Sequence, residues 1–292
     1  ETPREEVAVE PVNIQDALEQ VETLPTLPSV LGNVLSTAAD PDASALELAQ
    51  HISADQSLSA VLLKLVNSAY YGFYRQIKSV SQAIVMLGFL EVRNITLTAT
   101  AFQTLNQSSS SYDRLQLWRH SFASAMAAER FAKLLGVEQE GAFEAGLLHD
   151  IGKVVFDLLY PDLFRQAAQQ AHETERFIYV VEQEVFGMDH AEVGALLGER
   201  WNLPAGVTEA LKCHHCPETA EIEPELSMLT HLANYTAYLA DLGELSNGCA
   251  KEFPEEVAAK LGCTLEHCEQ IVDALQRKRE NIDEFLGVLG DV

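Results

Sequence analysis

The chain has 292 residues, of which 47% are hydrophobic and 22% are charged, a composition typical of a globular protein with a buried core and not of a disordered chain. Its 19 basic and 44 acidic residues give a formal net charge of −25, which repels phosphate groups, so we expect neither nucleic acid nor an anionic membrane as a direct partner. No apolar stretch approaches the roughly 18 residues of a membrane-spanning helix. The length predicts two domains or one large one.

Apolar residues recur at helical spacing along almost the whole chain. From Leu58 they follow at Val61, Leu62, Leu65 and Val66, which places them on one face of a helix. Comparable series occur within residues 30–38, 46–52, 122–135, 207–211 and 226–239. The alternating pattern of β-strands with hairpin turns is essentially missing, so the sequence predicts an all-α protein.

Polar residues mark where several helices begin. Ser44 followed by Glu47 has the pattern of a capping box, Asp189 can cap a helix that starts at His190, and Pro204 suits a first helical turn. The serine-rich residues 106–111 separate an N-terminal helical region from the rest. We interpret them as a boundary between two lobes, and a surface loop within one domain is the alternative.

Histidines concentrate in one half of the chain, together with one aspartate. Five of the nine histidines fall with Asp150 at predicted helical positions: His120, His149, His190, His214 and His215. On a single helix, His149 and Asp150 would share a face with Ala145 and Gly146, whose small size leaves room for other groups. Imidazole and carboxylate ligands suit Zn, Fe, Ni or Mn. The joint pattern favours a metal site, whereas any one histidine alone is more typical of an ordinary core or surface residue.

Several of these segments resemble known protein families. His120 with His149-Asp150-Ile151-Gly152-Lys153 resembles the HD phosphohydrolase superfamily, and Asp189-His190-Ala191-Glu192-Val193-Gly194 followed by His214-His215 resembles the extended set of HD-GYP phosphodiesterases. The N-terminal part is similar to the HDOD (HD-related output domain) family in Leu24-Pro25-Thr26-Leu27-Pro28, Asp40-Pro41-Asp42-Ala43-Ser44, Ile52-Ser53-Ala54-Asp55, Val66-Asn67-Ser68-Ala69-Tyr70-Tyr71-Gly72, and Ser79-Val80-Ser81-Gln82-Ala83-Ile84 with Leu87-Gly88. The resemblance covers about residues 20–242, and on these motifs the chain is identified as a member of the HDOD family.

The resemblance implies a metal site with a defined ligand set. Its ligands would be His120, His149, Asp150, His190, His214 and His215. Asp150 would bridge two divalent ions of unknown identity (Fe, Ni, Zn or Mn), and Lys153 would steady a substrate phosphate. An aspartate completes the superfamily's set, but Asn234 stands at the matching position, and its neutral amide binds a metal more weakly. The Gly-Tyr-Pro signature is also replaced, by Cys216-Pro217-Glu218-Thr219. Both departures argue against hydrolysis of a cyclic dinucleotide.

The resemblance also implies a role in bacterial signalling. We expect a cytoplasmic output module that binds protein partners, retains a metal site and has no turnover of its own. The alternative is a metal-dependent phosphohydrolase acting on a nucleotide or cyclic dinucleotide, with Asp150 and Lys153 as catalytic residues. Between the two lies a sensor whose HD pocket binds a phosphorylated small molecule without cleaving it. The oligomeric state stays open.

The expected organisation is a two-lobed helical bundle. Residues 1–11 would form a tail, 12–107 the N-terminal HDOD lobe, 112–242 the HD-like lobe and 243–292 a helical extension. The extension carries an apolar series that we expect to cover the HD-like lobe: Ile271, Ala274, Leu275, Ile282, Phe285 and Leu286. An acidic appendage that faces a partner is the alternative.

Two further clusters have both an ordinary and a functional interpretation. The five cysteines are odd in number, which favours reduced thiols in a cytosol over a disulfide framework. A zinc knuckle from Cys213, Cys216, Cys263 and Cys268 is disfavoured by the unlike spacing of its two halves. The aromatic residues 70–74 are more typical of packing between the lobes than of an exposed patch for a partner.

Overall fold

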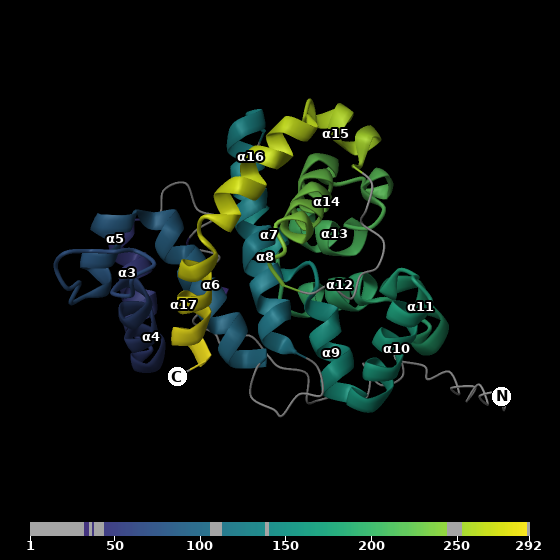
Figure 1. Cartoon of the computed structure of the whole chain (residues 1–292). Coiled ribbons are helices and arrows are strands. Elements are labelled where there is room, and N and C mark those ends of the chain that lie inside the picture. The colour runs from purple at the N-terminus through teal and green to yellow at the C-terminus, as the bar shows by residue number, and fades with distance from the viewer. Residues whose placement is uncertain are drawn as a thin grey trace.

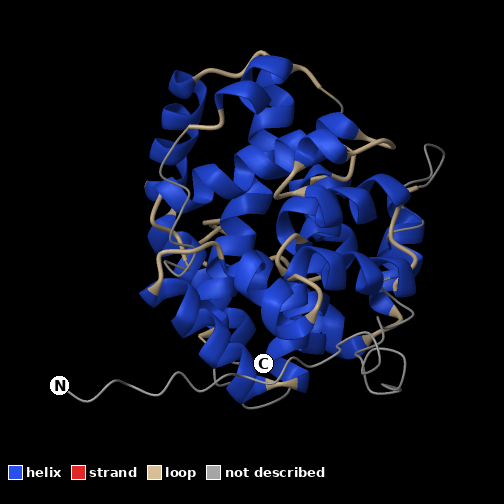
Figure 2. Cartoon of the chain, turned by 90° about the vertical axis from the view of Figure 1, so that its right-hand side faces the viewer, coloured by secondary structure: helices blue, strands red, loops and turns tan. Residues whose placement is uncertain are grey.

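The computed structural model describes residues 32–34, 37, 44–105, 113–137, 140–243 and 253–290. Within these ranges every regular element is helical, so the prediction of an all-α protein is confirmed (Figures 1 and 2). None of the described helices is long and apolar enough to span a membrane. The predicted tail, most of the series at 30–38 and the serine-rich residues 106–111 lie outside the described residues, and the domain boundaries stay a prediction.

The helices fall into three consecutive groups along the chain (Figure 1). The first comprises α3 (Ala45–Ser53), α4 (Gln56–Val66), α5 (Val80–Leu87) and α6 (Phe89–Leu105). The second comprises α7 (Arg114–Leu135), α8 (Ala142–Leu148), α9 (Ile151–Leu159), α10 (Pro161–Glu173), α11 (Ile178–Phe186), α12 (His190–Arg200), α13 (Ala205–Cys213), the 3₁₀ turn η1 (Pro217–Thr219) and α14 (Pro224–Leu239). The third comprises α15 (Glu255–Leu261), α16 (Leu265–Gln276) and α17 (Arg279–Gly290).

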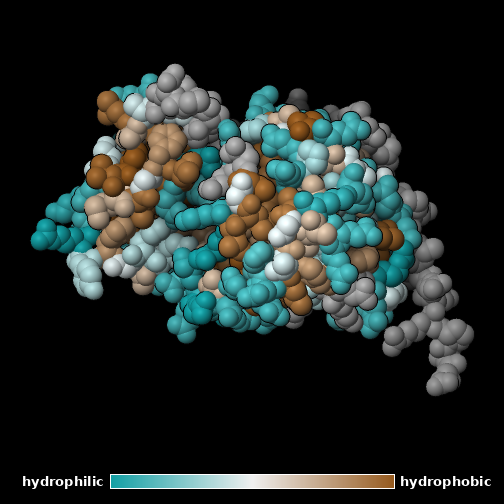
Figure 3. Space-filling view, turned by 90° about the horizontal axis from the view of Figure 1, so that it is seen from above, coloured by the Kyte–Doolittle hydropathy of each residue, from teal (hydrophilic) through white to brown (hydrophobic). Residues whose placement is uncertain are grey.

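The first group is held by helix caps and by the apolar faces that the sequence predicted. The Ser44 hydroxyl accepts a hydrogen bond from the backbone N–H of Glu47 at 3.2 Å, and the Glu47 carboxylate accepts one from the backbone N–H of Ser44. This exchange confirms the capping box. Side chains such as Leu62 and Leu65 are completely buried where α4 meets α5 and α6. Brown, apolar atoms nevertheless gather on the outer surface at this end of the molecule (Figure 3). On α3, α5 and α6, four apolar side chains are more than half exposed: Leu46, Val85, Met86 and Leu90.

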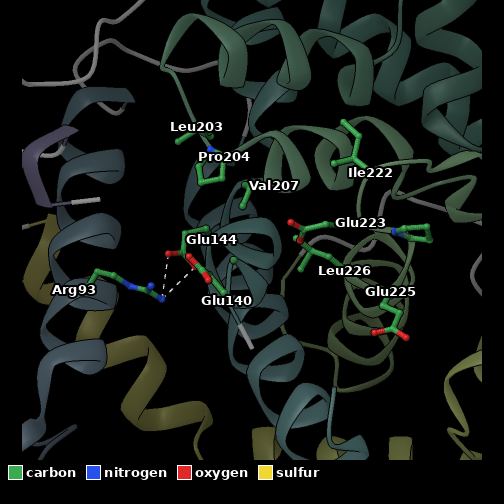
Figure 4. Close-up of a pocket in the computed structure, with 12 residues that line it drawn as sticks. Arg93, Glu140, Glu144, Leu203, Pro204, Val207, Ile222, Glu223, Glu225 and Leu226 are labelled. Atoms are coloured by element: carbon green, nitrogen blue, oxygen red, sulfur yellow. Dashed lines mark hydrogen bonds and ion pairs between the residues drawn. The ribbon is translucent and has the colours of Figure 1, made fainter. Parts of the chain in front are cut away.

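Helix α6 joins the first group to the second. It is buried on most of its circumference and contacts α4 and α5 on one side and α8 on the other. Arg93 on α6 forms a buried ion pair with Glu144 on α8 at 3.1 Å (Figure 4). Because breaking such a pair leaves an uncompensated buried charge, the pair fixes how the two groups face each other.

Two glycines allow the helices of the second group to approach closely. A Cβ atom at Gly146 would lie 2.7 Å from the Cα of Ala125, which brings α8 against α7. A Cβ atom at Gly152 would lie 2.0 Å from the carbonyl oxygen of His190, which brings α9 against α12. The room that the small residues were expected to leave is therefore filled by neighbouring helices.

The third group packs on the other two. Helices α15 and α16 contact α14, whereas α17 contacts α4 and α6 as well as α7 (Figure 1). Phe285 of α17 stacks on Phe122 of α7 with ring centroids 4.7 Å apart, and it lies 5.3 Å from the ring of Tyr70. The ordinary interpretation of the aromatic cluster thus holds for Tyr70, while Tyr74 is fully exposed.

Candidate metal centre

Most of the candidate ligands lie at the ends of helices. His149 ends α8 and Asp150 precedes α9, so the two residues form the junction of two helices. The expectation that they share one helix face with Ala145 and Gly146 is therefore wrong. His214 ends α13, and His190 is the first residue of α12. A helix end has free backbone groups, and these groups orient the side chains.

Two histidines are oriented by the free carbonyls of the helices that they end. His149 donates from Nδ1 to the carbonyl of Gly146 at 2.9 Å, and His214 donates from Nδ1 to that of Leu211 at 2.7 Å. A carbonyl only accepts, so Nδ1 carries the proton in both rings and Nε2 presents a lone pair when the ring is neutral. Both Nε2 atoms are buried and lack a hydrogen-bond partner among the described residues.

His190 is held from the opposite side by a carboxylate. The carboxylate of Glu182 on α11 accepts two hydrogen bonds from His190, one from the backbone N–H at 2.9 Å and one from Nδ1 at 2.5 Å. The capping box of Asp189 with Glu192 starts α12 at this residue, as the sequence predicted, so the backbone N–H has no partner within the helix. Nε2 of His190 then lies 3.1 Å from Asp150 and 2.9 Å from Nε2 of His215.

The carboxylate of Asp150 lies at the centre of the cluster. One oxygen is 3.4 Å from Nε2 of His149 and 3.9 Å from Nε2 of His120, and the other is 3.8 Å from Nε2 of His214. Lys153 donates from Nζ to the first oxygen at 2.9 Å and is completely buried. Five of the seven predicted ligands are at most 2% exposed, while His215 and Asn234 are half-buried.

The donor atoms form two groups that share this centre. His120, His149 and Asp150 offer ligand atoms within 4.8 Å of one another, and so do His190, His214 and His215. The Nε2 atoms of His149 and His214 therefore face the carboxylate of Asp150 without a hydrogen bond to it, an arrangement that a cation between them would stabilise. The residues present fit a divalent transition metal, because neutral imidazole and carboxylate are its usual ligands.

Asn234 takes the place next to His120. Its Oδ1 lies 2.9 Å from Nε2 of His120, and Nδ1 of the same ring has no partner among the described residues. The amide is thus within reach of the first donor group, at the position where the resemblance implies an aspartate. It brings an oxygen ligand but no charge.

Burial and the neighbouring charges shift the pKa values of the site. Burial lowers the pKa of His120 to about 3, and it also drives the pKa values of His214 and His215 well below their ordinary value. Burial opposes the charged forms of His190 and Asp150 as well. The carboxylate of Glu182 nevertheless raises the pKa of His190 to about 9, and the cluster of His149 and Lys153 holds the pKa of Asp150 well below its usual range.

Sequence reasoning missed Glu182. It is completely buried on α11, eight residues before His190, and no motif includes it. Local sequence carries no signal for it, because Glu184 stands two residues further on and is exposed, and only the fold distinguishes the two acids. Cys213, Cys216, Cys263 and Cys268 contribute to neither donor group, so the described residues give the zinc knuckle no support.

A pocket of about 710 Å³ is lined by residues of α6, α8, α13 and α14 and of the segments between them (Figure 4). Pro204, Val207 and Leu226 form apolar parts of its wall, and glutamates such as Glu140 and Glu223 border it. None of the seven predicted ligands lines this pocket.

Comparisons with known proteins identify the family. An uncharacterized protein of Treponema pallidum (strain Nichols) is 30% identical over 226 residues, which is 76% of this chain and 44% of the relative, so the chain spans less than half of that protein. The structure resembles an HDOD domain protein of unknown function from Geobacter sulfurreducens, with a TM-score of 0.79, 26% identity and coverage of 93% and 96% of the two chains. A candidate signal transduction protein from Marinobacter aquaeolei VT8 shares the fold, with a TM-score of 0.78, 23% identity and coverage of 95% and 61%. The model of the HDOD domain matches residues 24–217, and the chain belongs to the HDOD domain family.

Proposed function

We propose that this chain is a signal-transduction module that binds protein partners, holds a divalent metal in its His/Asp cluster and does not turn over a substrate. The observation that carries the proposal is the position of Lys153. Its ammonium group is completely buried and bound to Asp150, so it is not available to a phosphate that arrives from solvent. Phosphoryl transfer needs such a charge at the substrate.

The burial of the ligands supports the same conclusion. Asp150, His149 and His214 are at most 1% exposed, and a hydrolase must bring both its substrate and a water molecule to the metal. A bound metal would supply positive charge for Asp150 and for the two inward lone pairs. Bound by ligands from these elements, the metal would link the junction of α8 and α9 to α12 and α13.

The role in signalling rests on the family and on the surface. The family resemblance implies that HDOD proteins act as interaction modules in output pathways. The exposed apolar side chains on α3, α5 and α6 are of the kind that favours contact with another protein. A net charge of −25 favours a partner surface that is basic.

The test measures metal content and turnover separately. Elemental analysis of the purified chain should find metal, and the double variant His149→Ala with Asp150→Ala should lose it. The metal-loaded chain should release no product from a panel of nucleotides, phosphoesters and cyclic dinucleotides. Absence of metal from the unmodified chain would contradict the metal site.

Turnover would support the second candidate, a metal-dependent phosphohydrolase. The observation in its favour is that the carboxylate of Asp150 contacts histidines of both donor groups, as a residue that bridges two ions would. Cleavage of any member of the panel by the wild-type chain, but not by the double variant, would replace the proposed module with this enzyme.

A further inference from the structure

A second pocket, separate from the metal cluster, lies where the three helix groups meet. Its volume is about 510 Å³, within the usual range for small-molecule sites. Tyr70 and Ile95 line it from the first group, Met126 and Arg130 from α7, and Phe285 from α17. A ligand here would contact all three groups at once.

Three cations converge on this pocket. Arg130 and Lys133 extend from the last turns of α7, and Lys278 stands immediately before α17. Among the described residues, none of the three forms an ion pair or a side-chain hydrogen bond. In a chain with 44 acidic and 19 basic residues, an unpaired cluster of cations is unexpected.

The two carboxylates of the pocket are already engaged. Glu91 accepts a hydrogen bond from the hydroxyl of Tyr71 at 2.6 Å, and Glu129 accepts one from Asn94 Nδ2 at 2.7 Å. Burial raises the pKa of Glu129. Burial and the nearby charge of Arg130 lower the pKa of Lys278, although the carboxylate of Glu91 opposes them. With three cations against two carboxylates, the formal charge of the lining is positive.

An aromatic ring stands beside these cations. Nζ of Lys278 lies 5.2 Å from the ring centroid of Tyr70, and the ring itself is half-buried. Among the described residues, the Tyr70 hydroxyl contacts only the weak acceptor Met126 Sδ, at 3.9 Å. The rings of Tyr71, Phe285 and Phe122 lie around it, with centroids 4.7, 5.3 and 6.2 Å away. Such a wall suits a flat ring, because aromatic faces stack on bases.

We propose that this inter-lobe pocket binds a phosphorylated ligand of nucleotide size, with its phosphate on Arg130, Lys133 and Lys278 and its flat ring against Tyr70. The lining residues come from all three helix groups, so a bound ligand would favour the relative position of the groups in which all of its contacts form. This site is independent of the metal cluster, and it stands or falls separately from the proposed function.

The test is calorimetric titration of the full chain with adenosine, guanosine and cytidine 5′-monophosphates, with guanosine and inorganic phosphate as partial probes. At least one mononucleotide should bind, and the two partial probes should bind at least about tenfold more weakly. Arg130→Gln and Lys278→Gln should each weaken binding about tenfold, since a charged hydrogen bond contributes about 1.5 kcal/mol or more. Tyr70→Leu should weaken it as well, whereas Tyr70→Phe should retain most of the affinity.

Lys260→Gln is the matched control, because it removes the same charge from an exposed position on α15. It should leave the affinity unchanged, and circular dichroism should show that every variant is folded. Three outcomes overturn the site: no mononucleotide binds at millimolar concentration, Lys260→Gln weakens binding as much as Lys278→Gln, or the affinity is lost in the metal-site double variant instead. Equal binding of inorganic phosphate and the mononucleotides would overturn the role of the ring.

Discussion

Glu182 fixes His190 by accepting two of its hydrogen bonds, one from the backbone and one from Nδ1. The ring cannot rotate without losing the second bond, so Nε2 stays directed at Asp150. The carboxylate also increases the basicity of the imidazole, which makes it a stronger ligand. A residue that touches no candidate ion thereby sets the geometry of the second donor group.

Glu182→Gln should therefore weaken metal binding by about 10- to 100-fold while the ligands stay in place. Competition with a chelator of known affinity measures the change. Glu184→Gln is the control, since Glu184 is an exposed residue of the same helix that pairs with Arg176. Equal affinity in the two variants would show that Glu182 has only a structural role.

Lys153→Met should destabilise the metal-free chain by about 3–5 kcal/mol, because it leaves the buried carboxylate of Asp150 without its ammonium partner. A bound divalent ion supplies positive charge at the same carboxylate, so the loss should be smaller when Mn²⁺ or Zn²⁺ is present. Urea unfolding with and without chelator measures both values. The same loss under both conditions would argue against an ion at Asp150.

Asn234→Asp should raise the affinity for a divalent metal, because it places a charged oxygen where the amide now lies 2.9 Å from His120. Without metal, the added carboxylate stands near that of Asp150 and should lower the melting temperature. Thermal unfolding in chelator and in metal should show opposite shifts relative to wild type. A lower melting temperature in both conditions would place the side chain outside the coordination sphere.

Gly152→Ala should destabilise the fold by about 3 kcal/mol, because the new methyl group meets the backbone carbonyl of His190. Gly287→Ala is the matched control. It lies on the exposed face of α17 with no atom within 4 Å of the added Cβ, so it should be neutral or stabilise by up to about 1 kcal/mol. Denaturant unfolding compares the two, and equal effects would contradict the close contact of α9 and α12.

Acidification should weaken the hydrogen bonds through which the carboxylate of Glu209 on α13 holds the backbone of residues 221–223. Burial raises the pKa of Glu209, but the backbone N–H groups of Glu221, Glu223 and Ile222 outweigh it, so the pKa lies below its ordinary value. Stability from this carboxylate is complete above the ordinary value and is lost as pH falls through the lower folded value. Glu209→Gln should thus destabilise the chain at pH 7, and its difference from wild type should shrink as the pH falls below the ordinary carboxyl value. A difference from wild type that is independent of pH would contradict the charge's role.

The sequence predicted the helical class because the apolar spacing is local, and it predicted the caps at Ser44 and Asp189 because their partners lie three residues away. It placed His149 and Asp150 wrongly within a helix, because two short helices separated by a tight junction preserve nearly the same spacing. Glu182 and the inter-lobe pocket depend on contacts between distant segments. No local pattern carries that information.

Helix α17 has a consequence for the order of assembly. The residues that form the metal cluster end with α14, yet the contacts that lock the first helix group against α7 come from α17: Glu284 accepts the N–H of Ala69 at 2.9 Å, and Asp283 pairs with Arg119 at 2.6 Å. During synthesis, the earlier groups emerge from the ribosome before α17 can form these contacts. Until α17 emerges, the first group is held to the second by contacts of α6, among them the Arg93–Glu144 ion pair and the hydrogen bond from Asn94 to Glu129.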